Sequence, residues 1–475
     1  MNPPNVPEPH DSEFSPEEIE VCLKVLQQIA NFPGSLRRDD RFKGLISKIY
    51  KETRRDESRD ERWRKLTEDR AVRASTAMVQ IQRDPYGPAL AQPALPSAYA
   101  PPAGTLNEPE NCYICKTEYT EVHFFYHLLC PVCAEFNYRM RHVRADLTGR
   151  TALVTGGRVK IGYQTVLRLL RDGARVIMTT RFPNAAARRF HAEPDSDAWE
   201  DRLLLYGLDL RNIPAVERFA YHLLETEPSL DIVVHNAAQT VRRPHGFYRE
   251  LVAQEQCPQK TLSPQARRLV REAEPAPIAL LAGAGAAQAL IPNALDVLPA
   301  DALEDNEERA DSRTINSWLL RLDEVSAPEM LEVQLVNSVA PFLLNSRLKA
   351  LLMRSPFARR FIVNVSAVEG QFRRHKTVFH PHTNMAKAAL NMMTRTSGED
   401  YAKDGIYMNS VDTGWVTDEN PTPKRTRIQE DRGFFPPLDI FDGMARIYHP
   451  IAEGITSDEQ PLFGLFLKDY APCPW

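Results

Sequence analysis

The chain has 475 residues, of which 43% are hydrophobic, and a formal net charge of −4. This length and apolar content predict a globular protein with more than one domain. The slightly acidic balance argues against a protein whose main task is to bind nucleic acid or an anionic membrane surface. No apolar run approaches the roughly 20 residues that span a bilayer, and the first residues lack the features of a secretion signal. We therefore expect a cytoplasmic protein without membrane segments.

Four of the seven cysteines form two closely spaced pairs. The pairs are Cys112 with Cys115 and Cys130 with Cys133, whereas Cys22, Cys257 and Cys473 are scattered. This pattern is typical of metal binding in a reducing compartment rather than of a secreted disulfide framework. Two tight turns can bring four thiolates around one tetrahedral zinc, which predicts a closed structural site. His123 and His127 suggest an alternative, a second metal site, but the segment offers too few ligands for a cross-braced zinc finger.

The region before the cysteines divides by composition into two parts. Residues 1–83 combine apolar residues at helical spacing, such as Ile19, Leu23 and Leu26, with long runs of interleaved charge. We expect this region to be helical, with a charged face that is either simply solvated or available to a protein partner. Residues 84–110 are rich in Pro and Ala and predict an extended linker. Residues 111–146 then form the four-cysteine zinc module.

From residue 147 to the C-terminus, short apolar segments alternate with helical patterns. Candidate strands are residues 152–154, 175–179, 203–205, 231–235, 361–365 and 406–411, and candidate helices are 161–170, 216–224, 330–353 and 385–403. The alternation predicts an α/β fold, a doubly wound parallel sheet of Rossmann type over 147–475. An insertion at about 244–325 interrupts it. The stretch from Pro275 to Glu308 either borders the ligand pocket or is a surface loop without a role.

The first strand of this domain leads into a glycine-rich turn that opens a helix. A strand followed by such a turn can cradle a pyrophosphate against the amides of the helix N-terminus. The candidate cofactor-binding residues in the turn are Thr155, Gly156, Gly157, Arg158, Lys160, Ile161 and Gly162. The sequence therefore predicts a dinucleotide site at the start of the domain.

Several motifs in order resemble the short-chain dehydrogenase/reductase family over about two thirds of the chain. The family's Thr-Gly-x-x-x-Gly-x-Gly aligns with residues 155–162, its Asn-Asn-Ala-Gly with 235–238, and its active-site lysine with Lys387. The resemblance implies a nicotinamide dinucleotide cofactor and a small-molecule substrate. It further implies that Asp209 holds the adenine ring, Asn236 and Ala237 the pocket wall, Lys387 the nicotinamide ribose and Thr417 the nicotinamide amide, and that Asn337 is the family's helix asparagine.

Two basic residues bear on the choice of cofactor. Lys160 stands where the family has its middle glycine, and it can neutralise phosphate charge. Arg181 follows the second strand, where an acidic residue would favour the ribose diol of NAD. A guanidinium at that point suits the 2′-phosphate of NADP, so we expect NADP(H), with NAD(H) as the alternative.

The proton relay of the family is altered at two positions. Its tyrosine, four residues before the lysine, is replaced by Thr383, and an aliphatic alcohol is far less acidic than a phenol. Its serine aligns with Ala367, so that Ser366 lies one residue early and substitutes only where the strand end bends. His382 or His380 can act as proton donor at neutral pH, or these histidines cap the following helix or pack against the insertion.

Two functions fit these observations. The first is an NADP(H)-dependent oxidoreductase with an atypical proton relay, acting on a carbonyl, an alcohol or an activated alkene. The candidate catalytic residues are Lys387, Asn337, Thr383, His382 and Ser366. The alternative is an inactive NAD(P)-binding scaffold or sensor whose zinc module engages a protein partner. The acidic net charge argues against a zinc module that binds nucleic acid. The sequence is compatible with a homo-oligomer but does not predict the oligomeric state.

Overall fold

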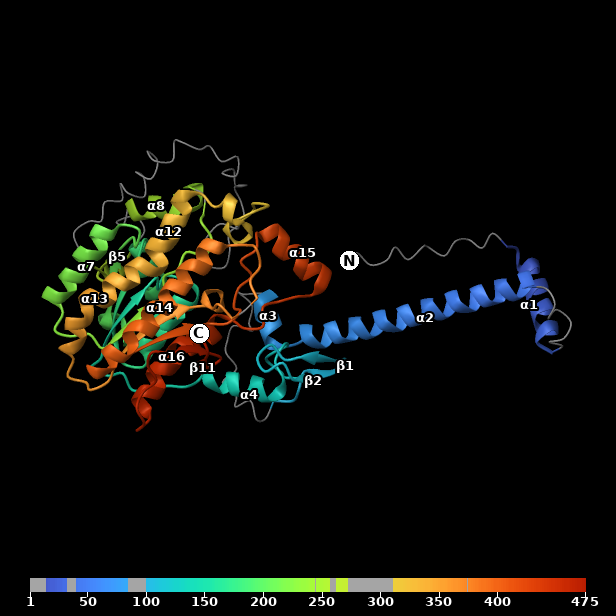
Figure 1. The fold of residues 1–475 in the computed structure, drawn as a ribbon, viewed down its shortest axis with the longest axis horizontal. Helices are drawn as coiled ribbons and strands as arrows, with labels where there is room; N and C mark the ends of the chain where they lie inside the picture. The colour runs from blue at the N-terminus through green and yellow to red at the C-terminus, as the bar shows by residue number, and fades with distance from the viewer. Residues whose placement is uncertain are drawn as a thin grey trace.

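The structure is a computed structural model, and it describes residues 14–31, 40–83, 100–243, 245–256, 262–271, 311–373 and 375–475. Figure 1 shows a large sheet domain, a small module against it, and a long helix that extends away from both. None of the helices in the described ranges combines the length and the apolar composition needed to cross a membrane.

A nine-stranded sheet forms the centre of the large domain. Its strands are β3 (Thr151–Thr155), β4 (Arg175–Thr180), β5 (Leu203–Gly207), β6 (Ile232–His235), β7 (Val270–Arg271), β8 (Arg360–Ser366), β9 (Ile406–Asp412), β10 (Phe466–Lys468) and β11 (Ala471–Cys473). The order is β11-β10-β9-β8-β6-β3-β4-β5-β7, and every pairing is parallel except that of β10 with β11. The six predicted strands are present, whereas the edge strands β7, β10 and β11 were not predicted.

Helices cover both faces of the sheet, as the predicted doubly wound fold requires. One apolar core joins the sheet to α5 (Lys160–Arg171), α6 (Pro183–His191) and α16 (Ile440–Thr456). The helices on the other face are α7 (Ile213–Thr226), α13 (Ala340–Met353) and α14 (Pro381–Lys403). The predicted helix 330–353 is α12 (Ala327–Gln334), which runs into α13 through a π-helical turn at Leu335–Val339.

The topology creates a crevice beside β3. The chain runs from β3 to β4 and β5 on one side, and then returns to β6 on the other side of β3. Loops that leave the carboxyl ends of β3 and β6 therefore separate, and ligands of open α/β sheets bind at such a switch point. The glycine turn follows β3 and Asn236 follows β6, so both lie at this crevice.

The N-terminal third contains helices and the cysteine module. The helices are α1 (Pro16–Asn31), α2 (Asp40–Ala74) and α3 (Ala77–Arg83), and the module consists of β1 (Gly104–Asn111), β2 (Glu118–Val122) and α4 (Pro131–Met140). The prediction of an extended linker over residues 84–110 was wrong at its C-terminal end, because β1 pairs with β2 from Gly104 onward. A search for apolar residues at every second position does not detect this strand, because Leu106 is its only large apolar side chain.

The insertion is partly structured where it is described. It contributes α8 (Arg249–Gln256), α10 (Pro264–Arg267) and the edge strand β7. The stretch from Pro275 to Glu308 lies outside the described residues, as does Cys257. The remaining helix is α15 (Thr422–Arg432), and short 3-10 turns lie at Ser196–Ala198, Glu200–Arg202, His245–Tyr248, Ser317–Leu319, Leu322–Glu324 and Val368–Gly370.

Candidate dinucleotide site and four-cysteine centre

The glycine turn packs so closely against the loop after β6 that it has no room for side chains. Gly156 has φ +72°, and a Cβ there would lie 2.8 Å from the Cα of Ala237. A Cβ on Gly162 would lie 2.3 Å from both the Gly156 carbonyl oxygen and the Asn236 amide nitrogen. Asn236 Nδ2 donates to the Gly156 carbonyl at 2.9 Å, and the Ala237 amide donates to Thr155 Oγ1 at 3.2 Å. The turn is therefore fixed by backbone approach, as a phosphate cradle requires.

Lys160 begins α5 in a conformation that favours glycine. Its φ is +54°, in the left-handed region that costs a non-glycine residue about 1 kcal/mol. The first amides of α5 have no partner within the helix, and Val159 at the N-cap provides no side-chain acceptor. Lys160, Ile161 and Gly162 line a cavity of about 450 Å³. An anion in this cavity would meet both the helix N-terminus and the lysine charge.

Most of the predicted cofactor residues line this one cavity. They are Gly156, Arg158, Lys160, Ile161, Gly162, Arg181, Asp209, Asn236, Ala237 and Thr417. Thr155, Gly157 and Lys387 are not among its lining residues. Thr155 supports the wall through its bond to Ala237, and Gly157 faces the side chains of Met178 and Val166.

The lining of the cavity is predominantly basic. Its charged residues are Arg158, Lys160, Arg181, Arg211, Arg242 and Arg243 against Asp209, Glu332 and Glu419. The sequence analysis did not identify Arg211, Arg242, Arg243 and Glu332 as lining residues. Only Arg211 could have been found, because it lies two residues after Asp209. Burial alone would raise the pKa of Asp209, but its bonds with Arg211, at 2.6 to 3.1 Å, lower it. The residues present therefore fit a ligand that carries several negative charges.

Asn337 and Lys387 hold backbone segments at the edge of this crevice. Asn337 lies in the π-helical turn, accepts from the Gln239 amide at 2.7 Å and donates to the Gln239 carbonyl at 3.1 Å. Gln239 itself lines the cavity. Lys387 Nζ donates to the Val365 carbonyl at 2.8 Å, and burial lowers the pKa of this lysine to about 8.

Thr383 and Ser366 do not form the serine–tyrosine pair of the family. Ser366 is buried and donates to Asn391 Oδ1 at 2.6 Å. Asn391 lies eight residues beyond Thr383 on α14, about 12 Å along the helix axis. Thr383 is also buried, and its hydroxyl has no hydrogen-bond partner among the described residues. Ser366 thus anchors α14 to the sheet through Asn391, and its hydroxyl is not paired with Thr383.

The two histidines at the start of α14 have different neighbours. His380 is the N-cap of α14, stacks on Trp318 with ring centroids 3.8 Å apart, and its Nδ1 lies 2.9 Å from the Trp318 carbonyl. His382 is buried, and its Nε2 lies 3.6 Å from Glu329 Oε1. His382 therefore has a carboxylate beside it, whereas His380 is engaged by the insertion.

The four cysteines come together in the small module. The sulfur atoms of Cys112, Cys115, Cys130 and Cys133 all lie within 4.8 Å of one another. The Cys115 and Cys130 sulfurs are 3.7 Å apart, and a tetrahedral zinc with Zn–S bonds of about 2.3 Å separates its sulfurs by about 3.8 Å. The donor set therefore fits one closed zinc site. His123 and His127 bind backbone groups instead, at the Phe125 amide and the Phe435 carbonyl.

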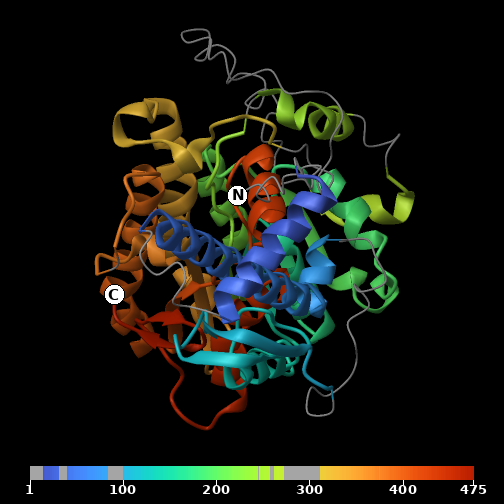
Figure 2. The same cartoon turned by 90° about the vertical axis from the view of Figure 1, so that its right-hand side faces the viewer.

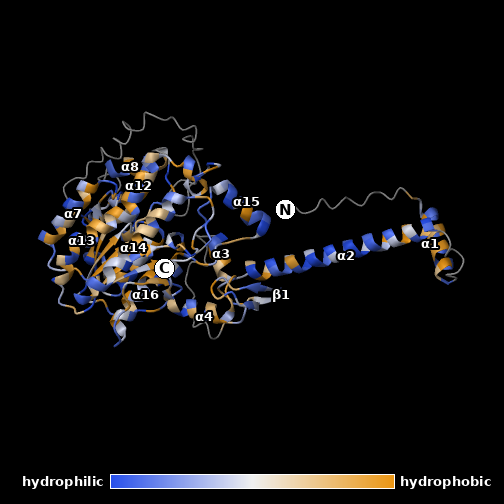
Figure 3. Ribbon diagram, in the orientation of Figure 1, coloured by the Kyte–Doolittle hydropathy of each residue, from blue (hydrophilic) through white to orange (hydrophobic). Residues whose placement is uncertain are grey.

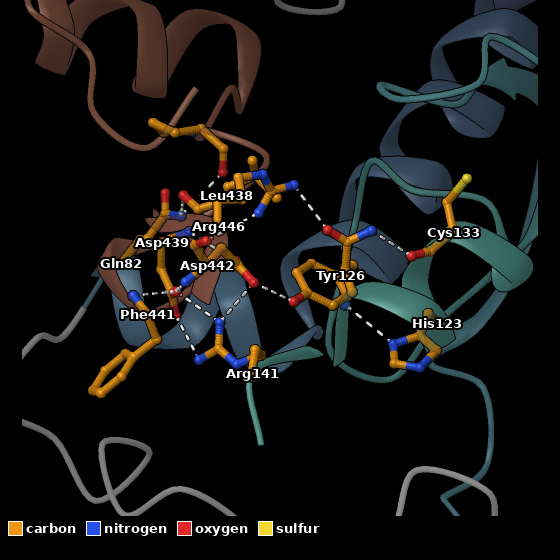
Figure 4. A network of polar contacts seen from close by, with 12 residues as sticks. Gln82, His123, Tyr126, Cys133, Arg141, Leu438, Asp439, Phe441, Asp442 and Arg446 are labelled. Atoms are coloured by element: carbon orange, nitrogen blue, oxygen red, sulfur yellow. Dashed lines mark hydrogen bonds and ion pairs between the residues drawn. The ribbon is translucent and has the colours of Figure 1, made fainter. Parts of the chain in front are cut away.

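A buried polar network joins the module to the sheet domain, as Figure 4 shows. Arg141, which ends α4, makes two bonds of 2.7 and 2.9 Å to Asp439 and lies 3.0 Å from Asp442. Tyr126 donates to Asp442 at 2.5 Å. Asp439 caps α16, directly before Ile440, which lines the cavity. The apolar core of the module also includes Val416 and contacts Ile161, two further lining residues.

Comparison with known proteins identifies the large domain. The family model for short chain dehydrogenases matches residues 150–256. The chain is 32% identical to an uncharacterized protein, R665, of Acanthamoeba polyphaga mimivirus over 357 residues, 72% of this chain and 71% of that protein. Human dehydrogenase/reductase SDR family member 13 is 40% identical over 93 residues, 19% of this chain and 24% of its own length. The match to this named relative therefore spans about a quarter of that protein.

The NADPH-bound carbonyl reductase from chicken fatty liver is similar over 70% of this chain and 100% of that chain, with 17% identity and a TM-score of 0.42. The glycine turn, the parallel sheet with its switch point and the matched segment lead to one conclusion. The chain belongs to the short-chain dehydrogenase/reductase family of NAD(P)-dependent oxidoreductases.

Proposed function

We propose that the protein is an NADP(H)-dependent oxidoreductase that acts on a carbonyl, an alcohol or an activated alkene. The observation that carries the proposal is the basic cavity built around the glycine turn, with six basic lining residues against three acidic ones. NADP(H) carries one phosphate more than NAD(H), so this excess of positive charge favours it. The chain would also hold one structural zinc on its four clustered cysteines.

Each part of the site would contribute one task. Lys160 and the amides at the start of α5 would bind the pyrophosphate, and Arg181 the 2′-phosphate. Arg181 is oriented by the ring of Tyr248, 4.4 Å from its guanidinium carbon. The bound cofactor supplies or accepts hydride. Lys387, held by the Val365 carbonyl, would keep a positive charge near the nicotinamide ribose.

The proton would come from His382 rather than from a tyrosine. This imidazole has a carboxylate beside it, with Glu329 Oε1 3.6 Å from its Nε2. Thr383 is adjacent on α14, but its alcohol is a poor acid at neutral pH. His382 would therefore deliver a proton directly or through one ordered water.

The inactive scaffold is retained as the second candidate, because one set of observations favours it. Trp318 and Leu320 of the insertion contact His380, at the N-terminus of α14. Lys387 and Thr383 are buried and do not line the cavity. A protein that only senses the cofactor would need the basic cavity. It would tolerate the contacts of the insertion with α14 and the burial of Lys387 and Thr383.

Turnover separates the two candidates. We expect the full chain to bind NADPH by calorimetry and to oxidise it with at least one member of a panel of aldehydes, ketones and enones. His382→Ala should abolish most of the turnover and leave NADPH affinity within about threefold, because His382 is assigned no cofactor contact. His380→Ala, on the same helix start, is the control and should keep turnover. NADPH binding without oxidation over the panel would favour the scaffold.

Arg181→Ala should separate the two cofactors. We expect NADPH affinity to fall about 10- to 100-fold, the value of one or two charge-assisted hydrogen bonds, with NADH affinity changed less than about threefold. Lys160→Gly is the matched control, since it removes a charge beside the pyrophosphate shared by both cofactors and also relieves the positive φ. Calorimetric titrations with both cofactors give the comparison. Equal losses in Arg181→Ala would assign this arginine a general electrostatic role only.

Lys387 should give cofactor binding a dependence on pH. Because burial lowers its pKa to about 8, the ammonium form is lost as pH rises through this value. We expect NADPH affinity to fall about tenfold across that range in the wild type and to be flat in Lys387→Met. A lysine with a lowered pKa destabilises the fold below that pKa, so Lys387→Met should unfold at no lower temperature at neutral pH. Lys403→Met, exposed at the end of α14, is the control.

A further inference from the structure

The first two helices form an arm that extends from the rest of the molecule. Figure 1 shows α2 leading away from the sheet domain, with α1 at its far end. Figure 2, viewed from the side to which the arm points, shows the two blue helices in front of the domains. No residue of α1 is buried, and in the 35 residues of α2 only Asp69, close to the module, is buried. A helix of this length reaches about 50 Å. The arm therefore presents nearly its whole surface to its surroundings.

The far end of the arm is apolar along one side of each helix. On α1 the stripe is Ile19, Leu23 and Leu26, and on α2 it is Leu45, Ile46 and Ile49. These side chains are between 38% and 60% exposed and recur at the three- and four-residue spacing of one helix face. Residues 14–50 hold 10 of the 23 exposed large apolar side chains in the described residues, so the exposure is concentrated here. Figure 3 shows apolar residues on both helices at this end.

The middle of α2 is stabilised differently. It carries i, i+3 and i, i+4 ion pairs, such as Arg59 with Asp56 and Arg64 with Glu68, which suit a helix surrounded by water. Ion pairs of the same kind lie beside the stripe of α2, Lys43 with Asp40 and Lys48 with Glu52, but the apolar side chains of the stripe remain 39% to 60% exposed. An exposed apolar patch of this kind marks an interaction surface.

The charges of the two helices identify the partner. Residues 16–31 carry three glutamates and one lysine, whereas residues 40–55 carry six basic residues and two acidic ones. One helix is therefore acidic and the other basic, and each would repel a copy of itself. The pairing that buries both stripes and matches both charges places α1 of one protomer against α2 of its partner, and the reverse. The same surface is used twice, which is the condition for a twofold dimer.

We propose that the protein is a homodimer held together by these arms, with two copies of α1 and of the first part of α2 forming a four-helix bundle. The bundle leaves the sheet domains at the outer ends of the arms, so the dinucleotide cavities stay accessible. This inference is independent of the proposed enzymatic function, since it concerns no residue of the cavity.

The first test is the mass of the full chain in solution. Sedimentation equilibrium should give twice the mass of one chain. Leu23→Glu with Ile49→Glu should raise the dissociation constant at least about 100-fold, because each glutamate would be buried without a partner. Gln28→Glu with Ser47→Glu adds the same charge on the opposite side of each helix and should leave the dimer intact. Circular dichroism and the unfolding temperature, measured in parallel, confirm that the sheet domain is folded in every variant.

The second test addresses which helices pair. One variant changes Glu17, Glu18 and Glu20 to Lys, and the other changes Lys48, Lys51 and Arg55 to Glu. Each alone should dissociate at low salt, and an equimolar mixture should regain the dimer, because only then does each basic helix meet an acidic one. A wild-type monomer at every concentration, a dimer that survives Leu23→Glu with Ile49→Glu, or variants that do not recover on mixing would overturn the proposal. Pelleting with phosphatidylserine vesicles without self-association would assign the arm to membranes and overturn it as well.

Discussion

Removal of the metal from the four-cysteine centre is expected to unfold the module and weaken the dinucleotide site at the same time. The module spans few residues and has a small apolar core, so the metal–thiolate bonds would supply much of its folding free energy, about 10 kcal/mol or more in small zinc domains. Its core shares Val416 with the cavity lining and contacts Ile161. We therefore expect NADPH affinity to fall at least about tenfold when the module unfolds, through the loss of these supports.

The measurement uses Cys130→Ser in the full chain and metal analysis of the wild type, which should find about one zinc per chain. Cys130 is buried at the start of α4, so its loss opens the centre from within. The control is Cys22→Ser, an exposed cysteine on α1 far from the centre. Circular dichroism and calorimetry then report helix content and NADPH affinity. A folded, metal-free protein with unchanged affinity would refute both the zinc assignment and the coupling.

Local sequence patterns predicted the parts of the fold that follow from local chemistry. The buried strands β3 to β6, β8 and β9 are continuous apolar segments, and the glycine turn carries its own signature, so both are readable without a structure. The short edge strands β7, β10 and β11 have two or three residues and no period to detect. The π-helical turn at Leu335–Val339 is equally invisible, because its residues continue a helical pattern.

The residues of the candidate site were also predictable only where a local motif marks them. Residues next to a motif, such as Gly156 and Asn236, could be aligned and do line the cavity. The orientation of the Ser366 side chain could not be predicted, because it depends on a hydrogen bond between the end of β8 and Asn391 of α14. Arg242 and Arg243 lie at the start of the insertion, where no pattern assigns them a direction. Long-range pairs such as Arg141 with Asp439, 298 residues apart, have no local signal at all.

Arg141→Met is expected to cause a large loss of stability. The guanidinium is buried and compensates two buried carboxylates, Asp439 and Asp442. Removing one partner of a buried ionic network leaves the others uncompensated and costs about 3 to 5 kcal/mol. Since Asp439 caps α16 immediately before Ile440, the substitution should also loosen the wall of the cavity and lower NADPH affinity.

The pH dependence of this loss provides an internal check. Burial raises the pKa of Asp442, whereas Arg141 outweighs the effect of burial at Asp439 and lowers its pKa. Without Arg141 both carboxyls would take up protons more readily, so the difference in unfolding free energy between wild type and Arg141→Met should shrink as pH falls. Arg139→Met, exposed on the same helix, is the control and should cost less than about 0.5 kcal/mol. A difference that stays constant with pH would mean that Arg141 stabilises the interface by packing against the Phe125 ring, 4.6 Å away, rather than by its charge.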